Sequence, residues 1–288
     1  MFDRVLKYGS KGDDVKRMQT ILNKDGYALA TDGSFGGGTL SAVKSFQKQR
    51  GLTPDGVVGI NTMGMLKKLS DRKYSIKWHR GYIQVISFPK FSNPIVDVID
   101  PGSRLETIEQ MYRGLNRKPT LMFNGSLFDM KSGATLSRVV DEGVVKGYGY
   151  YSIYGLRYDV KTGISFTNVW KDAKEFIGFS PALVINGVRQ TERKDLDNGF
   201  INNLHPRTAF AESADAYHII MAHGRRSSLG HRGMTINELK DFCINDLHAY
   251  NAGNFDGGGS SIVLNEIGKP INKFLEKRKI DNAVAIYI

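Results

Sequence analysis

The 288-residue sequence predicts a multidomain protein, in which a small all-α domain of three short helices precedes an α+β domain with a mixed or antiparallel sheet. The first observation is a repeat. The pattern D-G-x-x-G-x-x-T begins at Asp32 and again at Asp55, among segments with the apolar spacing of helices. The second observation is that short β-rich runs and polar loops make up most of the remaining chain. We therefore expect domains at residues 1–70 and 78–288, joined by a linker at 71–77.

The chain is strongly basic, with a formal net charge of +11 and a pI near 9.5, which points to an anionic partner. Nucleic acid, anionic lipid and the phosphate-rich wall of a Gram-positive cell all fit that charge. The excess is +5 over residues 1–72 and +6 over residues 73–288 and forms no basic stripe, which disfavours a nucleic-acid binder. The single cysteine, Cys243, excludes an internal disulfide and a cysteine-rich zinc site, and its helical context predicts a buried small apolar residue.

The N-terminal stretch MFDRVLKYGSKGDD is polar within a few residues and lacks the apolar segment that a signal peptide needs. No run of about 18 apolar residues occurs, so we expect no membrane insertion. These observations predict a protein that is made in the cytoplasm and that another agent releases if it acts outside the cell.

Three helices are expected in the first domain. The first begins at an Asp13 N-cap and stops at Gly26, and its apolar stripe consists of Val15, Met18, Ile21 and Leu22. In each copy of the repeat, the Asp-Gly pair makes a tight turn, and the segment around Thr39 or Thr62 opens a helix. The apolar face of the first of these helices consists of Ala42, Val43 and Phe46.

This module resembles the peptidoglycan-binding domain of bacterial and phage wall hydrolases. The resemblance covers nearly all of residues 4–68 and rests on Gln19, Leu22, Gly26, Asp32, Gly33, Phe35, Gly36, Thr39, Phe46, Gln47, Asp55, Gly56, Gly59 and Thr62. The sequence departs from it at Gly37 and Ile60, where such modules often carry proline. The resemblance implies a wall-binding domain that targets peptidoglycan and has no catalytic constellation of its own.

The second domain is expected to consist mainly of strands. Its β-rich runs are YIQVISF, PIVDVI, TLMF, ALVI, RTAFA, YHIIMA, SIVL and NAVAIYI. Two helices lie between them. One covers about residues 106–115, and the other lies in TINELKDFCIND, where Thr235 is the N-cap and Glu238 its capping-box partner. Strands with scattered helices favour an α+β domain.

Polar residues cluster where these strands end, in MFNGSLFD, LHPRTAF, AHGRRSS and NFDGGGSS. Taken singly, each loop is typical of ordinary structure, because Asn-Gly and Asp-Gly are common turns and Gly-Arg-Arg is typical of a solvated loop. If they contribute to one pocket, they supply an acid, two arginines and an amide: Asp256, Arg207, Arg225 and Asn124. Such a set can bind a sugar and a phosphate together.

The same ordered motifs resemble the phosphodiester glycosidase family, which includes the enzyme that removes N-acetylglucosamine from a sugar-phosphate diester. The matching segments, within a resemblance that covers roughly residues 80–288, are Asn124–Asp129, Pro206–Ala209, Gly233–Leu239 and Phe255–Ser261. Ser126 stands where family members often have a second glycine, and the chain reads GNFDGGGSS where the family often reads NLDGGGSS. These departures affect packing more than chemistry.

A phosphodiester leaves C1 of a sugar with little acid help if cations neutralise its charge, so one carboxylate and arginines form a sufficient set. We assign Asp256 as the carboxylate that acts on the anomeric carbon or its water. Arg207 is assigned as the main phosphate clamp, because its planar fork matches phosphate geometry, and Arg225 as its helper.

Other residues are expected to bind and orient the substrate. Asn124 would orient the sugar, and His205 would contribute a proton unless it is a surface histidine. Glycine amides can converge on an anion, and a hydroxyl beside them can reach the phosphate or the ring hydroxyls; the candidates are Gly257, Gly258, Gly259 and Ser260. The alternative is a glycine-rich hairpin without a site.

No metal or other cofactor is expected, although the use of a divalent cation stays open. His218, His223 and His231 form no HExxH motif and no dense His/Asp cluster, which argues against zinc. The aromatic stretch YGYYSIYGLRY, from Tyr148 to Tyr158, is typical of cross-strand packing, and stacking on sugars is the alternative.

Together these features predict a cell-wall-targeted hydrolase that cleaves a sugar-1-phosphodiester of the N-acetylglucosamine-1-phosphate type, such as the linkage of teichoic acid to peptidoglycan. Its partners would be peptidoglycan and an anionic wall polymer. The absence of a signal peptide favours a phage or prophage endolysin that a holin releases. The alternatives are a peptidoglycan-cleaving lysin of another bond specificity and a non-catalytic wall-binding or phage structural protein.

Overall fold

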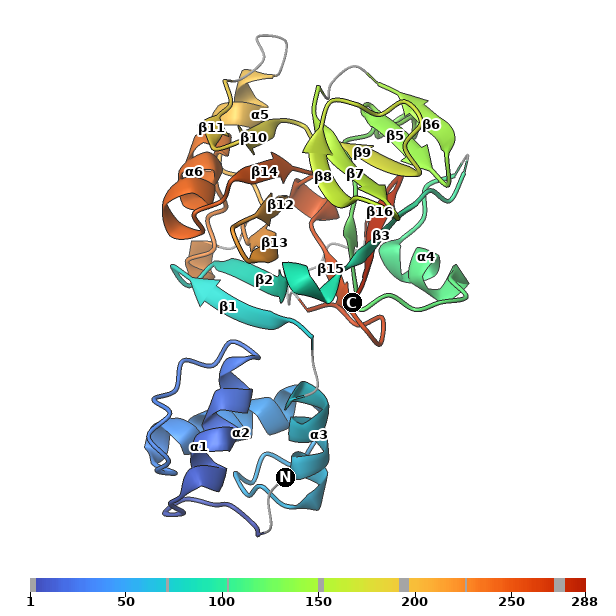
Figure 1. Ribbon diagram of the computed structural model, residues 1–288. Coiled ribbons are helices and arrows are strands. Elements are labelled where there is room, and N and C mark those ends of the chain that lie inside the picture. The colour runs from blue at the N-terminus through green and yellow to red at the C-terminus, as the bar shows by residue number, and fades with distance from the viewer. Residues whose placement is uncertain are drawn as a thin grey trace. The chain divides into compact units, whose positions relative to one another are not determined.

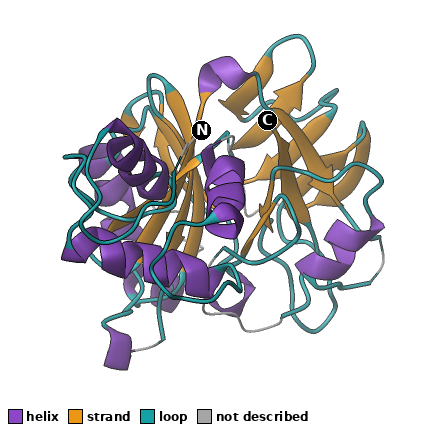
Figure 2. Cartoon of the chain, turned by 90° about the horizontal axis from the view of Figure 1, so that it is seen from below, coloured by secondary structure: helices purple, strands orange, loops and turns teal. Residues whose placement is uncertain are grey.

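The computed structural model of the protein describes residues 4–70, 73–102, 104–149, 153–191, 197–225, 227–271 and 278–288. The chain forms two compact units, of which one comprises Met1–Trp78 and Ile86–Phe88, and the other His79–Val85 and Pro89–Ile288. Helices are the main elements of the first unit, and strands dominate the second (Figure 1, Figure 2). The predicted combination of an all-α three-helix domain with an α+β domain is confirmed.

The first unit contains the three predicted helices, α1 (Asp13–Asn23), α2 (Gly37–Gln49) and α3 (Ile60–Ser70). They enclose one apolar core, which includes the fully buried Leu6, Met18, Leu22, Phe35, Phe46 and Leu66. The predicted N-cap is wrong by one residue, because Gly12 and not Asp13 is the N-cap of α1. The Gly12 carbonyl accepts the amide of Lys16, which is the first bond of the helix, so Asp13 already lies inside it.

A buried glutamine of α1 holds the first copy of the repeat together. The Nε2 atom of Gln19, which is 1% exposed, donates to Asp32 Oδ1 at 2.9 Å and to Thr39 Oγ1 at 3.2 Å. It also donates to the Ser34 carbonyl at 3.0 Å, while Gln19 Oε1 accepts the Gly33 amide at 2.9 Å. The buried amide is therefore satisfied at both ends, and it ties the turn to the start of α2.

The second copy repeats this glutamine network with Gln47 of α2. Its Nε2 atom donates to Asp55 Oδ1 at 2.8 Å and to Thr62 Oγ1 at 3.1 Å. It also donates to the Val57 carbonyl at 2.9 Å, and Gln47 Oε1 accepts the Gly56 amide at 2.8 Å. The repeated Asp and Thr are thus the two side chains that a buried glutamine contacts in each copy.

The strands form three sheets. The seven-stranded sheet has the order β1 (Ser75–His79), β2 (Ile83–Pro89), β13 (Ala216–Ala222), β12 (Arg207–Glu212), β14 (Asn251–Asn254), β10 (Ala182–Ile185) and β11 (Val188–Arg189). The four-stranded sheet has the order β15 (Val263–Asn265), β4 (Leu121–Asn124), β16 (Ala283–Tyr287) and β3 (Ile95–Ile99). The five-stranded sheet has the order β6 (Val144–Tyr148), β5 (Arg138–Asp141), β9 (Glu175–Gly178), β7 (Gly155–Asp159) and β8 (Gly163–Thr167). Each pair with a defined register is antiparallel.

The eight β-rich runs predicted from the sequence all contain strands, namely β2, β3, β4, β10, β12, β13, β15 and β16. The five-stranded sheet was anticipated only where the aromatic stretch overlaps β7 and the last residue of β6. Its strand β8 is half-buried at every position, so it shows no alternation of apolar and polar residues. Part of the predicted linker is also structured, because Ser75–Lys77 lie in β1, whereas residues 71 and 72 lie outside the described residues.

The second unit contains the two predicted helices, α4 (Ile108–Gly114) and α6 (Ile236–Asp241). The predicted capping box of Thr235 and Glu238 is present, and α4 has another with Thr107 and Gln110. After α6 the chain continues as a π-helical turn, Phe242–Asp246, in which Cys243 is fully buried, as predicted. Short helical segments not predicted are α5 (Asn198–Asn202), η1 (Lys90–Ser92), η2 (Ser227–Leu229) and η4 (Gly258–Ser260). Within the described ranges, no helix has both the length and the apolar character needed to cross a membrane.

An aromatic cluster joins the three sheets. The ring of Phe123 in β4 lies 6.0 Å from that of Phe210 in β12 and 5.4 Å from that of Phe255. Phe179, which follows β9, lies 5.4 Å from Phe255 and 5.4 Å from Phe166 of β8, measured between ring centroids. Such ring pairs stabilise beyond the area that they bury, so the strand ends near this cluster have a rigid base.

The glutamine network predicts a specific stability difference between two glutamines of α2. Gln47→Ala should lower the free energy of unfolding of the first unit by roughly 2 kcal/mol, because buried donors and acceptors lose their partner. Gln49→Ala, in the same helix but exposed, should change it by less than about 0.5 kcal/mol. Hydrogen exchange of the α2 amides measures both, and equal effects would contradict the structural role of Gln47.

Buried carboxyls predict how stability depends on pH. Burial raises the pKa of Glu175 to about 7 and the pKa values of Asp141 and Asp281 to about 6. The folded state therefore retains protons that the unfolded state releases near pH 4, so these groups favour folding at low pH, and this contribution is lost as pH rises to about 7. Thermal unfolding between pH 4 and 8 should show this fall, and Glu175→Gln should flatten it, whereas Glu266→Gln, at an exposed position, should not.

Candidate functional site

The strand ends that carry the four predicted loops lie close together. Three of them are at one end of the seven-stranded sheet, and the fourth is the end of β4 in the four-stranded sheet. Strand β12 is antiparallel to both of its neighbours, with Arg207 opposite Ala222 of β13 and Ala209 opposite Asn254 of β14. The start of β12 therefore lies beside the ends of β13 and β14. The loop that leaves β14 then crosses to β15, beside β4 in the four-stranded sheet. Residues far apart in the sequence are thus brought to one place (Figure 1).

Asn124, at the end of β4, connects this loop to both sheets. Its side chain is fully buried, and its Nδ2 atom donates to the Asp256 carbonyl at 2.8 Å. Its Oδ1 atom accepts the Thr208 hydroxyl at 2.8 Å and the Ile262 amide at 3.1 Å. A side chain with no exposed surface does not reach a sugar, so the predicted sugar contact does not fit this geometry. Asn124 lies beneath the site and positions it.

Asp256 lies in the glycine loop, and the pKa of its carboxyl group is raised. Its side chain is partly buried, its own backbone amide donates to the Gly125 carbonyl, and its Oδ1 accepts the Gly257 amide at 2.8 Å. Burial raises the pKa of this carboxyl, against the lowering effects of Ser260, the Gly257 amide and Arg278. The buried Ser260 hydroxyl lies near enough to lower the pKa but lacks the geometry of an ordinary hydrogen bond.

The glycines of this loop serve packing more than anion binding. Besides the Gly257 amide, at least three backbone amides of the loop donate hydrogen bonds to carbonyls of the protein. Gly258 donates to the Pro206 carbonyl, Ser260 to the Gly257 carbonyl and Ser261 to the Gly258 carbonyl. The predicted convergence of amides on an anion therefore does not hold for these groups or for the Gly257 amide. A Cβ atom on Gly257 would lie 2.6 Å from the Pro206 carbonyl oxygen, and Gly258 has a φ of 61°, which glycine adopts freely. Gly259 continues the short helical turn η4.

Arg207 is deeply buried and is used to hold neighbouring segments. The residue is 1% exposed, and its Nε atom donates to the Met234 carbonyl at 2.9 Å. Its Nη2 atom donates to the carbonyls of Phe200, at 2.6 Å, and Asn203, at 3.3 Å. Burial lowers its pKa to about 10. These contacts make Arg207 a positioning residue. Because the residue is buried, its predicted role as the main phosphate clamp does not fit this geometry.

Arg225 and His205 lie on the open side of the loop. Arg225 is exposed, and its Nη2 atom would lie 3.1 Å from a Cβ atom on Gly258. Burial lowers the pKa of the partly exposed His205, as do the charges of Arg207 and Arg225, whereas a bond to the Gly199 backbone raises it. His205 is therefore a neutral imidazole at pH 7, next to an accessible guanidinium.

Two residues of this site were not predicted. Thr208 donates its hydroxyl to Asn124, and its place directly after Arg207 in the matched motif could have indicated it. Arg278 is close enough to Asp256 to lower its pKa, but it stands in the run EKRK, which is typical of a solvated charged segment. Of the predicted aromatic stretch, residues 150–152 lie outside the described residues, Tyr148 is exposed and Tyr158 is buried.

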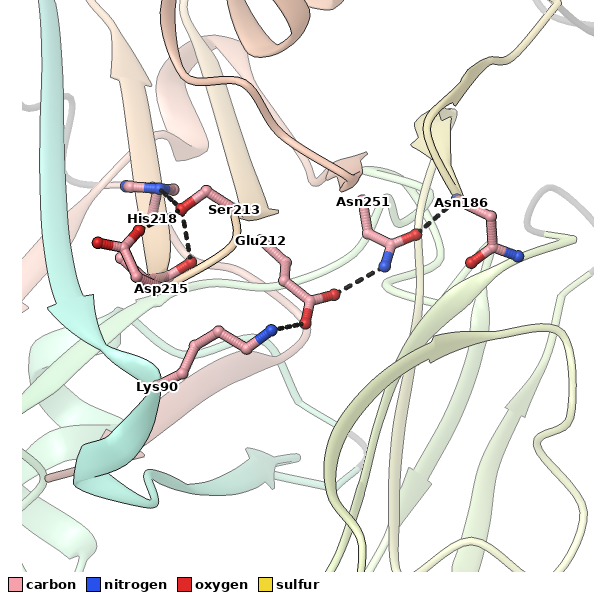
Figure 3. A network of polar contacts seen from close by, with 8 residues as sticks. Lys90, Asn186, Glu212, Ser213, Asp215, His218 and Asn251 are labelled. Atoms are coloured by element: carbon pink, nitrogen blue, oxygen red, sulfur yellow. Dashed lines mark hydrogen bonds and ion pairs between the residues drawn. The ribbon is translucent and has the colours of Figure 1, made fainter.

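The opposite end of the same sheet carries a serine, a histidine and an aspartate that resemble a catalytic triad only in composition (Figure 3). His218 Nε2 lies 3.0 Å from Ser213 Oγ, and burial lowers the pKa of His218 to about 4. Asp215, however, accepts from the Ser213 hydroxyl at 3.3 Å, where a triad needs the carboxylate on the imidazole. The Ser213 hydroxyl also reaches the Ala216 carbonyl, so the group stabilises the turn between β12 and β13.

A second network at that end ties three strands together (Figure 3). Glu212, the last residue of β12, forms an ion pair with Lys90 and accepts from Asn251 Nδ2 at 2.7 Å. Asn251 Oδ1 in turn accepts the Asn186 amide at 2.8 Å. With these side chains satisfied by one another, this end of the sheet is a structural region, and the candidate site lies at the other end.

In the part of the chain that the structure describes, no group of three or more His, Cys, Asp or Glu side chains could hold a metal ion. His223 and His231 lie near each other, with ring centroids 5.6 Å apart. Burial, together with the charge of His231, lowers the pKa of His223 to about 4. The candidate site itself contains the Asp256 carboxyl group, the Arg225 guanidinium and the His205 imidazole.

Two protein families match this chain. The model of the phosphodiester glycosidase family matches residues 118–287, more than half of the chain, and the model of the peptidoglycan binding domain matches residues 11–66. Together with the fold and the site, these matches define a hydrolase-like protein that is associated with the cell wall. The chain belongs to the phosphodiester glycosidase family.

Similar proteins are found for both parts. The catalytic domain of zebrafish N-acetylglucosamine-1-phosphodiester alpha-N-acetylglucosaminidase, auto-inhibited by its pro-peptide, shares the fold with a TM-score of 0.56 and 17% identity, over 75% of this chain and 81% of that chain. The spore cortex-lytic enzyme of Bacillus cereus is 40% identical over 67 residues, 23% of this chain and 26% of that protein. An N-acetylmuramoyl-L-alanine amidase of Bacillus licheniformis is 36% identical over 72 residues, 24% of this chain and 20% of that protein. The matches thus span about a quarter of the length of these curated relatives.

The two arginines of the site predict stability effects of very different size. Arg207→Lys should lower the free energy of unfolding of the second unit by about 3 kcal/mol, because lysine cannot reach its three carbonyl partners together. Arg225→Lys, at an exposed position, should change it by less than about 0.5 kcal/mol. Urea unfolding followed by hydrogen exchange in β12 compares the two. Equal stabilities would mean that the Arg207 contacts hold nothing in place.

Proposed function

We propose that the second unit hydrolyses a sugar-1-phosphodiester of the N-acetylglucosamine-1-phosphate type and that the first unit holds it on peptidoglycan. The observation that carries this proposal is the arrangement at the glycine loop. Asp256, a carboxylate of raised pKa, begins the loop, and the exposed Arg225 lies beside Gly258 in the same loop. Membership of the phosphodiester glycosidase family supports the choice of bond.

The chemistry of the leaving group explains why one carboxylate is enough. Ordinary glycosidases use two, because an alcohol needs a proton in order to leave. The leaving group of a sugar-1-phosphodiester is a phosphate monoester, which departs as a stable anion. In the proposed reaction, a water oxygen forms the new bond to C1, the bond from C1 to the phosphate oxygen breaks, and the phosphate takes the electron pair. The proton of the water passes to the Asp256 carboxylate, directly or after a covalent step at that carboxylate.

The charged groups of the site have separate roles in this proposal. Arg225 neutralises the departing phosphate, because its guanidinium is exposed beside the loop. His205, neutral at pH 7, donates a hydrogen bond or accepts a proton next to it. Arg207 and Asn124 position the site without contacting the substrate in this proposal, since their side chains donate to backbone carbonyls of the protein. Ser260 adjusts the acidity of Asp256.

The wall polymer that we propose as substrate is teichoic acid at its junction with peptidoglycan. This junction is a sugar-1-phosphodiester, and a chain of net charge +11 is attracted to an anionic polymer. The match to the peptidoglycan binding domain supports a substrate in the cell wall. We further propose that the protein is a phage or prophage lysin, which is made in the host cytoplasm and reaches the wall through a holin.

Purified walls test the choice of bond. Incubation with walls that carry teichoic acid should release a phosphate-containing polymer, without new amino groups and without cleavage of the glycan strand. Release of free amino groups would instead indicate a peptidoglycan amidase or peptidase, and internal reducing ends would indicate a glycan-cleaving lysin. Binding without any release would indicate a wall-binding or structural protein.

Asp256→Asn should separate catalysis from binding. On a model sugar-1-phosphodiester, its turnover should fall by roughly three orders of magnitude, because the amide keeps the shape but loses the basicity. Asp246→Asn, at an exposed residue of the same unit whose carboxylate pairs with Arg80, should keep full turnover, and both variants should still bind walls.

The pH profile gives a second measurement of the same carboxylate. Because burial raises the pKa of Asp256, activity should be lost as pH falls through a value above the ordinary aspartate pKa of about 3.9. An Asp256→Asn variant with wild-type turnover would show that this carboxylate is structural.

A further inference from the structure

The first unit contains a cavity of about 310 Å³ at the second copy of the repeat. Its walls include the apolar side chains of Leu52 and Ile60 and the polar side chains of Asp55 and Asn61. The volume is at the lower end of the range for small-ligand sites, and the mixture of apolar and polar walls is also typical of such sites. The Gln47 network described above forms the rigid floor beneath it.

Comparison of the two copies shows which residues are additional to the fold. Both copies have the glutamine network, so both hold the same turn. At the two positions before the threonine, however, the first copy has Gly37 and Gly38, and the second has Ile60 and Asn61. Ile60 is 86% exposed, and Asn61 is also exposed. Neither side chain is needed for the shared scaffold, and both line the cavity.

Asp55 offers a charged acceptor at this cavity. Its Oδ1 atom accepts the Gln47 amide and the Val57 backbone amide, each at 2.8 Å. The Val57 amide, and then Gln47, lower the pKa of the carboxyl, so that it stays ionised. Within the described residues, its Oδ2 atom has no hydrogen bond, which leaves an acceptor for a ligand. Lys44 lies near enough to balance part of the charge, so the ligand need not be a cation.

We propose that this cavity binds an N-acetylated sugar of the peptidoglycan glycan strand. Sugar hydroxyls and the acetamido N–H group donate to Asp55 and to the Asn61 side-chain oxygen, and the acetamido methyl group contacts Ile60 and Leu52. A stem peptide fits less well, because its carboxylates would meet the Asp55 charge. This inference rests on the wall-binding part of the proposed function and names the ligand that the first unit recognises.

The test uses the full-length protein and purified peptidoglycan from which teichoic acid has been removed. The double variant Ile60→Ser, Asn61→Ala should bind at least about tenfold more weakly than wild type. Val5→Ser, at a residue of the same unit that is 54% exposed and does not line the cavity, should bind like wild type. Because the changed side chains are exposed, we expect each variant to fold, and hydrogen exchange of α2 and α3 checks this.

Soluble probes identify the ligand chemistry. The tetramer of N-acetylglucosamine should compete with peptidoglycan for wild type and should shift the Asn61 side-chain amide resonance, whereas a free stem tetrapeptide should do neither. Competition by the tetrapeptide alone, or wild-type binding by the double variant, would overturn the inference. These outcomes differ from a failure of the proposed function, in which wild type itself does not bind peptidoglycan or does not cleave a soluble sugar-1-phosphodiester.

Discussion

The buried side chain of Asn124 is the interaction on which the candidate site depends. Its amide bonds to the Asp256 carbonyl, the Thr208 hydroxyl and the Ile262 amide, so one side chain joins β4, β12 and both ends of the glycine loop. An amide suits this place because it donates and accepts at once. A carboxylate there would oppose the Asp256 carbonyl, and an apolar residue would leave three buried polar groups without partners. The position of the Asp256 carboxylate, which we propose to be catalytic, thus follows from a residue that is itself fully buried.

The sequence was informative wherever a local rule applied. Eight strands, the Thr235 capping box and the repeat of the first unit all follow from periodicity and turn chemistry. The glutamines that bind the repeated Asp and Thr do not follow from such rules. Gln19 precedes Asp32 by 13 residues, whereas Gln47 precedes Asp55 by 8. The glutamines are equivalent in space, but their unequal spacing hides them from a search for a fixed period.

Residue type and burial are separate properties, which explains the remaining differences at the site. The motif placed two arginines near the loop, yet one has its donors on backbone carbonyls and the other is open to solvent. Likewise, the three glycines after Asp256 suggested free amides, although most of the loop's amides bond within the protein. Both outcomes depend on contacts between segments such as Pro206 and Gly257, which no local pattern in the sequence reports.

The duplicated glutamine network also makes the first unit open to engineering. Gln19 and Gln47 are buried and hydrogen-bonded within each copy, whereas Ile60 and Asn61 are exposed to solvent. At the matching positions of the first copy, Gly37 and Gly38 have ordinary φ angles, and a Cβ atom on either would meet open space. Side chains can be transplanted there without strain, so a single module of this kind has room for a second, independently chosen specificity.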